Sequence, residues 1–234
     1  MILCLETATH VCSVALCNQY GVITFSDNEE GRSHASLLTV FIDRILKEQG
    51  MKASDLDAVA VSKGPGSYTG LRIGVSAAKG IAYASSIPLI AVDTTLSMFH
   101  GFIDSAKSKY DFTDKDLFIP AIDARRMEIY YSVFDKNGKT VKGVSAEIMD
   151  QNSLNDLPGE ARIFIFGDGA AKCRDVVKRK NIYYSEEFKV SATGMHIPAY
   201  ESFNQRRFED VAYFEPFYLK DFITSRPKKN ILGR

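Results

Sequence analysis

Tryptophan is absent from this chain of 234 residues, and neither charge is in excess, since 29 lysines and arginines balance 29 aspartates and glutamates. A formal net charge of zero provides no global field that would attract nucleic acid or an anionic membrane. Proteins that read nucleic acid directly usually carry a basic patch. The basic cluster of this chain is confined to its last residues, Arg226, Lys228, Lys229 and Arg234. Direct recognition of nucleic acid is therefore not expected.

Cysteine is scarce, and no two cysteines form a Cys-x-x-Cys pair: the four are Cys4, Cys12, Cys17 and Cys173. This spacing favours small buried side chains in a reducing compartment over zinc ligands or disulfides. No apolar run reaches the ~18 residues that a membrane-spanning helix needs, and no charged segment followed by an apolar run indicates a signal peptide. We therefore expect a cytoplasmic protein that does not enter a membrane.

Several catalytic motifs are also missing. No Gly-x-Ser-x-Gly elbow indicates a nucleophile, and no Gly-Lys-Ser/Thr follows a glycine-rich turn at the spacing of a phosphate-binding P-loop. The four histidines are not spaced to share a helix face, and they are His10, His34, His100 and His196. We therefore expect no catalytic residue of these types, no metal site and no intrinsic cofactor.

The most informative stretch that is present is a glycine-rich run, Lys63–Gly74, which follows an apolar strand and opens a helix. Gly64 and Gly66 allow positive φ and close approach by another group, and Ser67 or Thr69 can cap the helix that follows. A rigid turn of this kind directs free N–H groups outward, where an anion could bind. The residues alone leave two interpretations open: a tight structural turn, or a phosphate or interface site.

Strands alternate with helices along the chain, which predicts parallel pairing and an α/β fold. In the first half we expect strands over residues 2–7, 11–17, 22–26, 57–62 and 89–92. We expect helices there over residues 34–49 (with Ser33 as N-cap), 71–84 and 94–103. In the second half we expect strands over residues 117–123, 128–135, 141–148, 162–166 and 182–184. We expect helices there over residues 151–157, 170–178 and 192–208. The polar stretch between the halves separates a lobe of residues 1–104 from a lobe of residues 105–234.

The two halves repeat each other. Glycine turns occupy matching positions, at Gly64–Gly70 and Gly167–Ala170, and an acidic residue ends the first strand of each half, Glu6 and Asp123. This repetition predicts the duplicated two-lobed architecture of actin, Hsp70 and hexokinase, the ASKHA or ribonuclease H-like fold.

The two acids and the first glycine turn are candidates for a nucleotide site. Glu6 and Asp123 could hold a Mg²⁺-nucleotide, with Gly64, Gly66 and Ser67 at its phosphates; alternatively, the two acids are polar turn residues. The glycine turns lack the lysine with which a P-loop binds phosphate. Nucleotide binding by this chain alone is therefore less favoured than a role of the two acids as polar turn residues. ATP or ADP with Mg²⁺ remains possible in a complex.

Two helices have features of docking elements. Helix 34–49 is apolar over more than half of its circumference, which exceeds the stripe of a helix that covers one core. The helix after the glycine turn has small residues at four-residue spacing, which lets another helix approach closely. The alternative is that both helices only cover their own sheet. The predicted interface residues are Leu37, Leu38, Phe41, Ile45, Gly70, Leu71, Arg72, Gly74, Val75 and Ala78.

Segments along the whole chain resemble the TsaB (YeaZ) family. Residues 2–9 with 12–16 are similar to the family's opening, and Gly64–Gly74 is similar to its signature. Asp123–Tyr130 resembles a strand of its second lobe, and Pro216–Lys220 resembles its C-terminal end.

The resemblance implies a non-catalytic scaffold in the bacterial machinery that makes N6-threonylcarbamoyladenosine at position 37 of tRNA. It implies binding to the catalytic paralogue TsaD and to the ATPase TsaE, contact with tRNA through the complex, and a homodimer when the chain is alone. In the family, the two helices named above dock the partner. The tail from Arg226 onward could touch tRNA within the complex.

The resemblance also bears on activity. The histidines that bind metal in the catalytic paralogue align with Thr94 and Met98, which are poor ligands for such a cation. This favours a chain without intrinsic activity, while the sequence leaves enzymatic activity open. The alternatives are a free-standing ASKHA-fold ATPase or small-molecule kinase, and a glycoprotease-like (M22) peptidase.

Overall fold

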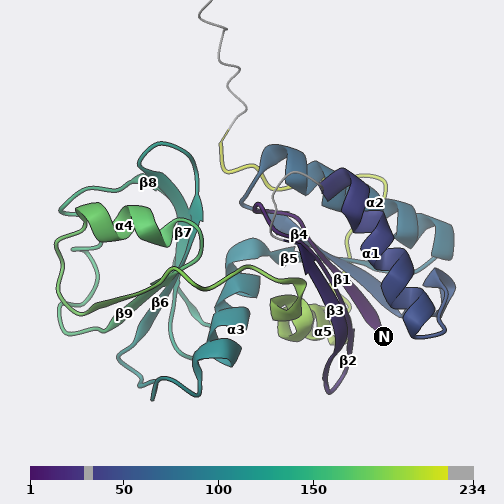
Figure 1. The fold of residues 1–234 in the computed structure, drawn as a ribbon, viewed down its shortest axis with the longest axis horizontal. Helices are drawn as coiled ribbons and strands as arrows, with labels where there is room; N and C mark the ends of the chain where they lie inside the picture. The colour runs from purple at the N-terminus through teal and green to yellow at the C-terminus, as the bar shows by residue number, and fades with distance from the viewer. Residues whose placement is uncertain (29–33, 221–234) are drawn as a thin grey trace, which may run out of the picture.

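The computed structural model describes residues 1–28 and 34–220 as two lobes, each built on a five-stranded mixed sheet (Figure 1). The expected N-cap Ser33 and the basic tail from Arg226 onward lie outside the described residues.

The sheet of the first lobe has the strand order β3-β2-β1-β4-β5. β1 pairs antiparallel with β2. It pairs parallel with β4, as the alternation of strands and helices predicts. Its strands are β1 (Ile2–Glu6), β2 (Cys12–Asn18), β3 (Gly21–Asn28), β4 (Ala58–Gly64) and β5 (Leu89–Asp93).

Both faces of this sheet are covered, which explains why every residue of β1 is buried. On one face, Leu3 and Leu5 pack with α1 (His34–Glu48) and α2 (Tyr68–Ser85). On the other face, Ile2 and Cys4 pack with η2 (Ala192–Met195) and α5 (His196–Asn204). The two sets alternate along β1 because successive side chains of a strand point to opposite faces. A short 3₁₀ helix, η1 (Ala53–Asp55), links α1 to β4.

The sheet of the second lobe has the order β10-β9-β6-β7-β8. Read from its other edge, as β8-β7-β6-β9-β10, it matches the first sheet position for position. Its strands are β6 (Leu117–Asp123), β7 (Glu128–Phe134), β8 (Thr140–Ile148), β9 (Ile163–Phe166) and β10 (Ile182–Ser185). α3 (Thr94–Ala106) covers one face, where Phe102 stacks on Phe166, and α4 (Ala170–Val176) covers the other. The repeated strand order confirms the duplicated actin-like α/β fold.

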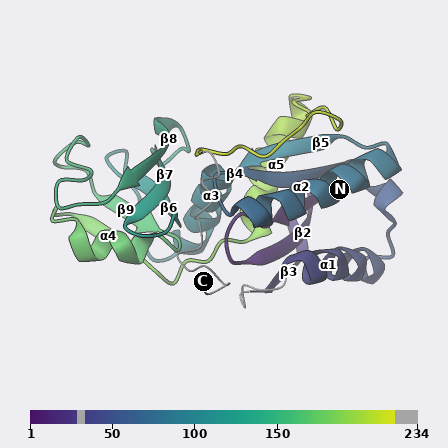
Figure 2. The same cartoon turned by 90° about the horizontal axis from the view of Figure 1, so that it is seen from above.

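α3 and α5 lie in the middle of the molecule, between the two sheets (Figure 1). The last helix was expected within the second lobe of residues 105–234, but its buried side chains belong to the core of the first sheet. It is also shorter than the expected span of 192–208, because η2 forms its first turn and α5 ends at Asn204. In Figure 2 the chain then runs back over the first lobe toward the second.

The helix predicted over residues 151–157 is wrong, because this stretch consists of turns. The Asp150 carboxylate accepts hydrogen bonds from the backbone N–H groups of Asn152 (2.7 Å) and Ser153 (2.9 Å). Such local bonds from an aspartate compete with the hydrogen bonds of a helix. Leu154 adds a left-handed backbone conformation, with φ of 66°.

All four cysteines are buried and unbridged, as expected. Within the described ranges, no helix is long and apolar enough to span a membrane.

Candidate functional site

The glycine turn after β4 is fastened to the turn between β1 and β2. The Ser67 N–H donates to the Ala8 carbonyl (2.6 Å), and the Thr7 hydroxyl donates to the Gly70 carbonyl (2.8 Å). The Ser67 hydroxyl caps α2 by accepting from the Gly70 N–H (3.2 Å), so that the helix begins at Tyr68, three residues earlier than predicted.

The glycines of this turn are needed for close contact with the chain's own backbone. A Cβ at Gly66 would lie 2.3 Å from the Ala8 carbonyl oxygen, and one at Gly70 would lie 2.1 Å from the Thr7 carbonyl oxygen. Gly64 has φ of 120°, and a Cβ there would lie 2.4 Å from the Phe217 carbonyl oxygen. Because the Ser67 amide is already bonded to Ala8, this geometry supports the structural turn more than a phosphate site at Gly64, Gly66 and Ser67.

The second glycine turn repeats this arrangement. The Gly169 N–H donates to the Ala121 carbonyl (3.0 Å), and a Cβ at Gly167 would lie 2.5 Å from the same oxygen. Both turns therefore use glycine to place a helix start against the first strand of their own lobe.

Glu6 lies in the interior and has no exposed surface. Its Oε1 accepts from the Ala8 N–H (2.6 Å), and its Oε2 has no hydrogen-bond partner among the described residues. Burial raises the pKa of Glu6 to about 7, against the backbone hydrogen bond from Ala8, which lowers it. The carboxyl is therefore close to half protonated at neutral pH.

Asp123 lies on the second lobe, where the chain's own groups engage it. Its carboxylate forms an ion pair with Lys172, and its N–H donates to Asp168 Oδ1 (2.9 Å). Asp168 Oδ2 lies 3.6 Å from Nδ1 of His10, in the turn after β1. The structure thus links the turn that follows Glu6 to the strand end at Asp123, through His10 and Asp168. Nucleotide binding by these residues stays a prediction.

The two positions that align with metal ligands of the catalytic paralogue lie in the interior. Thr94 is fully buried and Met98 is 1% exposed, in an aromatic core that includes Phe99 and Phe102. In the part of the chain that the structure describes, no group of three or more His, Cys, Asp or Glu could hold a metal ion.

Most of the predicted docking residues are buried within the chain itself. Leu38 is 1% exposed and Val75 is 4% exposed, and both pack on the sheet. The other buried members of the set are Phe41, Ile45, Gly70, Leu71, Gly74 and Ala78. A docking role for these residues stays a prediction. Leu37 is partly buried against the same core, whereas Arg72 is exposed. Helical periodicity shows that an apolar face exists, but not which face meets the sheet.

An open groove of about 530 Å³ lies between α1 and α2. It is lined by Ala35, Leu38, Thr39, Tyr68, Thr69, Arg72, Ile73, Ser76 and Ala77. Among the described residues that line it, Arg72 alone carries a charge. We call this feature the α1–α2 groove.

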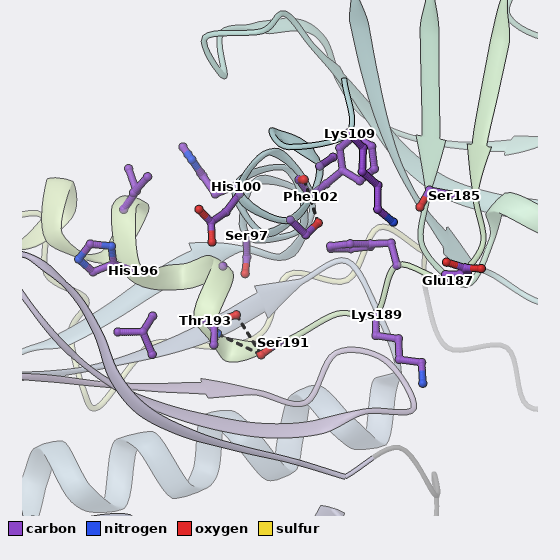
Figure 3. A pocket seen from close by; sticks show the side chains of 18 of the residues that line it. Ser97, His100, Phe102, Lys109, Ser185, Glu187, Lys189, Ser191, Thr193 and His196 are labelled. Carbon is purple, nitrogen blue, oxygen red and sulfur yellow. Dashed lines mark hydrogen bonds between the residues drawn. The ribbon is translucent and has the colours of Figure 1, made fainter. Parts of the chain in front are cut away.

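A larger pocket of about 1110 Å³ lies beside α3 (Figure 3). Ser97 and His100 of α3 line it together with Thr193 and His196, while Lys109 lies toward its other end. Burial and the nearby His196 lower the pKa of His100 to about 4, so that its imidazole is neutral at pH 7.

The wall of this pocket combines both charges: Lys109, Arg174 and Lys189 stand against Asp104, Glu186 and Glu187. This balance gives no preference for a charged ligand. None of the residues predicted to bind nucleotide lines the pocket. Sequence reasoning missed it because its walls come from segments near residues 20, 100 and 190.

Comparison with known proteins gives consistent matches. The model of the family TsaD, tRNA N6-adenosine threonylcarbamoyltransferase, matches residues 23–228. The chain is 31% identical over 231 residues to the tRNA threonylcarbamoyladenosine biosynthesis protein TsaB of Escherichia coli (strain K12), covering 95% of each chain. It is 47% identical over 62 residues to the tRNA N6-adenosine threonylcarbamoyltransferase of Streptococcus uberis, covering 26% of this chain and 18% of the other.

Among solved structures, YeaZ from Pseudomonas aeruginosa superposes with a TM-score of 0.77 at 24% identity, over 93% of this chain and 99% of that one. The fold and these matches define a two-lobed α/β protein related to the threonylcarbamoyltransferases. Within that class, the chain belongs to the TsaB (YeaZ) family, whose members are paralogues of TsaD.

Proposed function

We propose that this protein is a non-catalytic subunit in the formation of N6-threonylcarbamoyladenosine at position 37 of tRNA, and that it binds a catalytic paralogue of the TsaD family. The observation that carries the proposal is the match to TsaB of Escherichia coli along 95% of both chains. In this role the chain acts in the cytoplasm, and it meets tRNA and a TsaE-type ATPase through the complex.

The interior of the chain supports a role without chemistry of its own. Thr94 and Met98 are buried in place of metal ligands. The Ser67 amide is bonded to Ala8, and Asp123 is paired with Lys172. Any ATP or ADP with Mg²⁺ then belongs to the complex. The alternatives of a free-standing ATPase or kinase, or of a peptidase, require groups that are left free for a substrate.

The α1–α2 groove is the surface that we assign to the partner. The side chains of these helices fall into two groups: Leu38 and Val75 pack on the sheet, while Ile73 and Ala77 remain partly exposed. Apolar side chains at the mouth of a groove gain free energy when a partner removes them from water. A second copy of the chain could use the same surface in a homodimer when the paralogue is absent.

Replacing Ala77 with glutamate places a charge in the groove and should abolish co-purification with a TsaD-family enzyme, because burying an unpaired carboxylate is costly. Ala84→Glu is the matched control, since Ala84 is exposed on the same helix and does not line the groove. Both variants should keep the circular dichroism spectrum of the parent. Equal retention of the enzyme by Ala77→Glu and Ala84→Glu would remove the groove from the proposal.

A further inference from the structure

The exposed guanidinium of Arg72 is held in place at the rim of the α1–α2 groove. Its Cζ lies 4.1 Å from the centre of the Tyr68 ring, and its Nε donates to the Tyr218 hydroxyl (3.1 Å). The two tyrosine rings contact each other, with centroids 4.9 Å apart. An exposed arginine normally samples many rotamers, whereas this one is fixed by a cation–π contact and a hydrogen bond.

Tyr218 reaches this position on a C-terminal strap, which we define as residues 211–220. Lys79 of α2 donates to the carbonyls of Ala212 (3.2 Å) and Phe214 (3.0 Å). The Phe217 N–H donates to the Lys63 carbonyl (2.7 Å), and the Phe217 carbonyl occupies the space beside Gly64. The strap is therefore fastened to α2 and to the glycine turn, and it holds Tyr218 against Arg72.

The remaining donors of Arg72 are suited to a carboxylate. A guanidinium has five N–H groups in a planar fork, and the hydrogen bond to Tyr218 uses Nε–H. The outer part of the fork can bind a carboxylate through two parallel hydrogen bonds. Because the side chain is already ordered, less conformational entropy is lost when such a bond forms.

We infer that Arg72 determines the specificity of the α1–α2 groove by donating hydrogen bonds to a carboxylate on the bound segment of the partner. This inference rests on the proposed function, and it names the chemistry of the partner: an apolar segment that carries one acidic side chain. Charge complementarity favours such a segment over a second copy of the chain as the occupant of the groove. The groove lining contains one cation and no acid, so that a copy presenting the same lining would bring another arginine and no carboxylate.

The test measures the dissociation constant between the purified chain and a TsaD-family enzyme by titration calorimetry. Arg72→Gln should weaken binding by tenfold or more, and it should flatten the salt dependence, because a charge pair is lost. Tyr218→Phe keeps the charge but releases the fork, so its affinity should fall between those of the parent and Arg72→Gln.

Arg44→Gln is the matched control. Arg44 also lies over an aromatic ring, that of Phe41 at 5.0 Å, but it is outside the groove lining. If the parent chain binds the enzyme and Arg72→Gln binds it as tightly as Arg44→Gln does, the inference is overturned and the proposed function still stands. Absence of binding by the parent chain would overturn both. Weaker self-association of Arg72→Gln in sedimentation, with unchanged affinity for the enzyme, would assign the groove to a second copy and overturn the inference.

Discussion

Glu6, at the end of β1, shows how burial changes the ionisation of a side chain in this protein. Glu6 follows four buried apolar residues and remains in the interior itself, with one carboxylate oxygen bonded to Ala8 and the other without a partner among the described residues. Burial disfavours the charged form, which is why the pKa of Glu6 is raised to about 7. An acid that sequence alone places at a candidate magnesium site is thus a partly protonated interior group.

Glu6→Gln should remove a pH-dependent loss of stability. The pKa of Glu6 rises from its ordinary value of 4.5 to about 7 on folding, so the folded chain binds the proton more tightly and stability falls as pH rises from 4.5 to 7. The loss is on the order of 3 kcal/mol. Glutamine keeps the oxygen that accepts from Ala8 and cannot ionise.

Urea unfolding of both proteins at pH 5 and pH 8 measures this effect. The difference in the free energy of unfolding between Glu6→Gln and the parent isolates Glu6, because other titrating groups such as His100 occur in both proteins. Between the two pH values the free energy of unfolding of the variant should rise relative to that of the parent by about 2.5 kcal/mol, because part of the full effect already occurs below pH 5. A difference that stays constant with pH would contradict the account of this carboxyl.

Two glycines of α2 should respond to alanine in opposite directions. A Cβ at Gly70 would lie 2.1 Å from the Thr7 carbonyl oxygen, whereas a Cβ at Gly80 meets nothing within 4 Å. Gly70→Ala should therefore cost about 3 kcal/mol or more of stability through overpacking. Gly80→Ala should gain about 0.5–1 kcal/mol, because alanine favours a helix interior. Thermal melts of the two variants provide the measurement, and equal shifts would show that Gly70 is not held against Thr7.

At the scale of elements, sequence patterns predicted the strands well where apolar runs are short and bounded. Leu117–Asp123 has the same bounds in the sequence prediction and in the structure, because turn signals lie on both sides of it. The helix expected over the polar stretch 151–157 was wrong, since the side chains of Asp150, just before it, and Ser153, within it, form local hydrogen bonds to the backbone.

The docking face expected from the sequence is mostly buried in the structure. α1 is apolar over much of its circumference, but Leu38 and Ile45 meet the sheet, and the surface left to a partner is a groove shared with α2. Neither the groove nor the contact between Arg72 and Tyr218 could be read from spacing, because each joins segments that are distant along the chain.

Leu38→Glu should consequently act on folding. The side chain is 1% exposed in the core of the first lobe, and an unpaired carboxylate there has no compensating partner. Expression as aggregates, or a cooperative transition lost from the thermal melt, is the expected outcome. A soluble Leu38→Glu protein with the parent melting temperature would show instead that this face of α1 is a free surface.

The whole molecule joins two copies of one structural unit. Each lobe has the same strand order, a glycine turn against its first strand, and an acid at the end of that strand. The lobes meet at His10 and Asp168, whose Nδ1 and Oδ2 atoms are 3.6 Å apart, and where α3 contacts α5. The duplication was predictable because the two halves repeat their turns and acids in the same order. The return of α5 to the first sheet was not predictable, since no local signal in the sequence indicates which sheet a late helix covers.

The central claim is that this chain is required by the modification of tRNA while performing no chemistry itself. The measurement that tests it most directly is an omission assay with TsaD and TsaE homologues, tRNA, ATP and threonylcarbamoyl-adenylate, in which modified adenosine is counted with and without the chain. The account predicts that modification requires the chain, and that the chain alone neither hydrolyses ATP nor modifies tRNA. Equal modification without the chain, or ATP turnover by the chain alone, would contradict it.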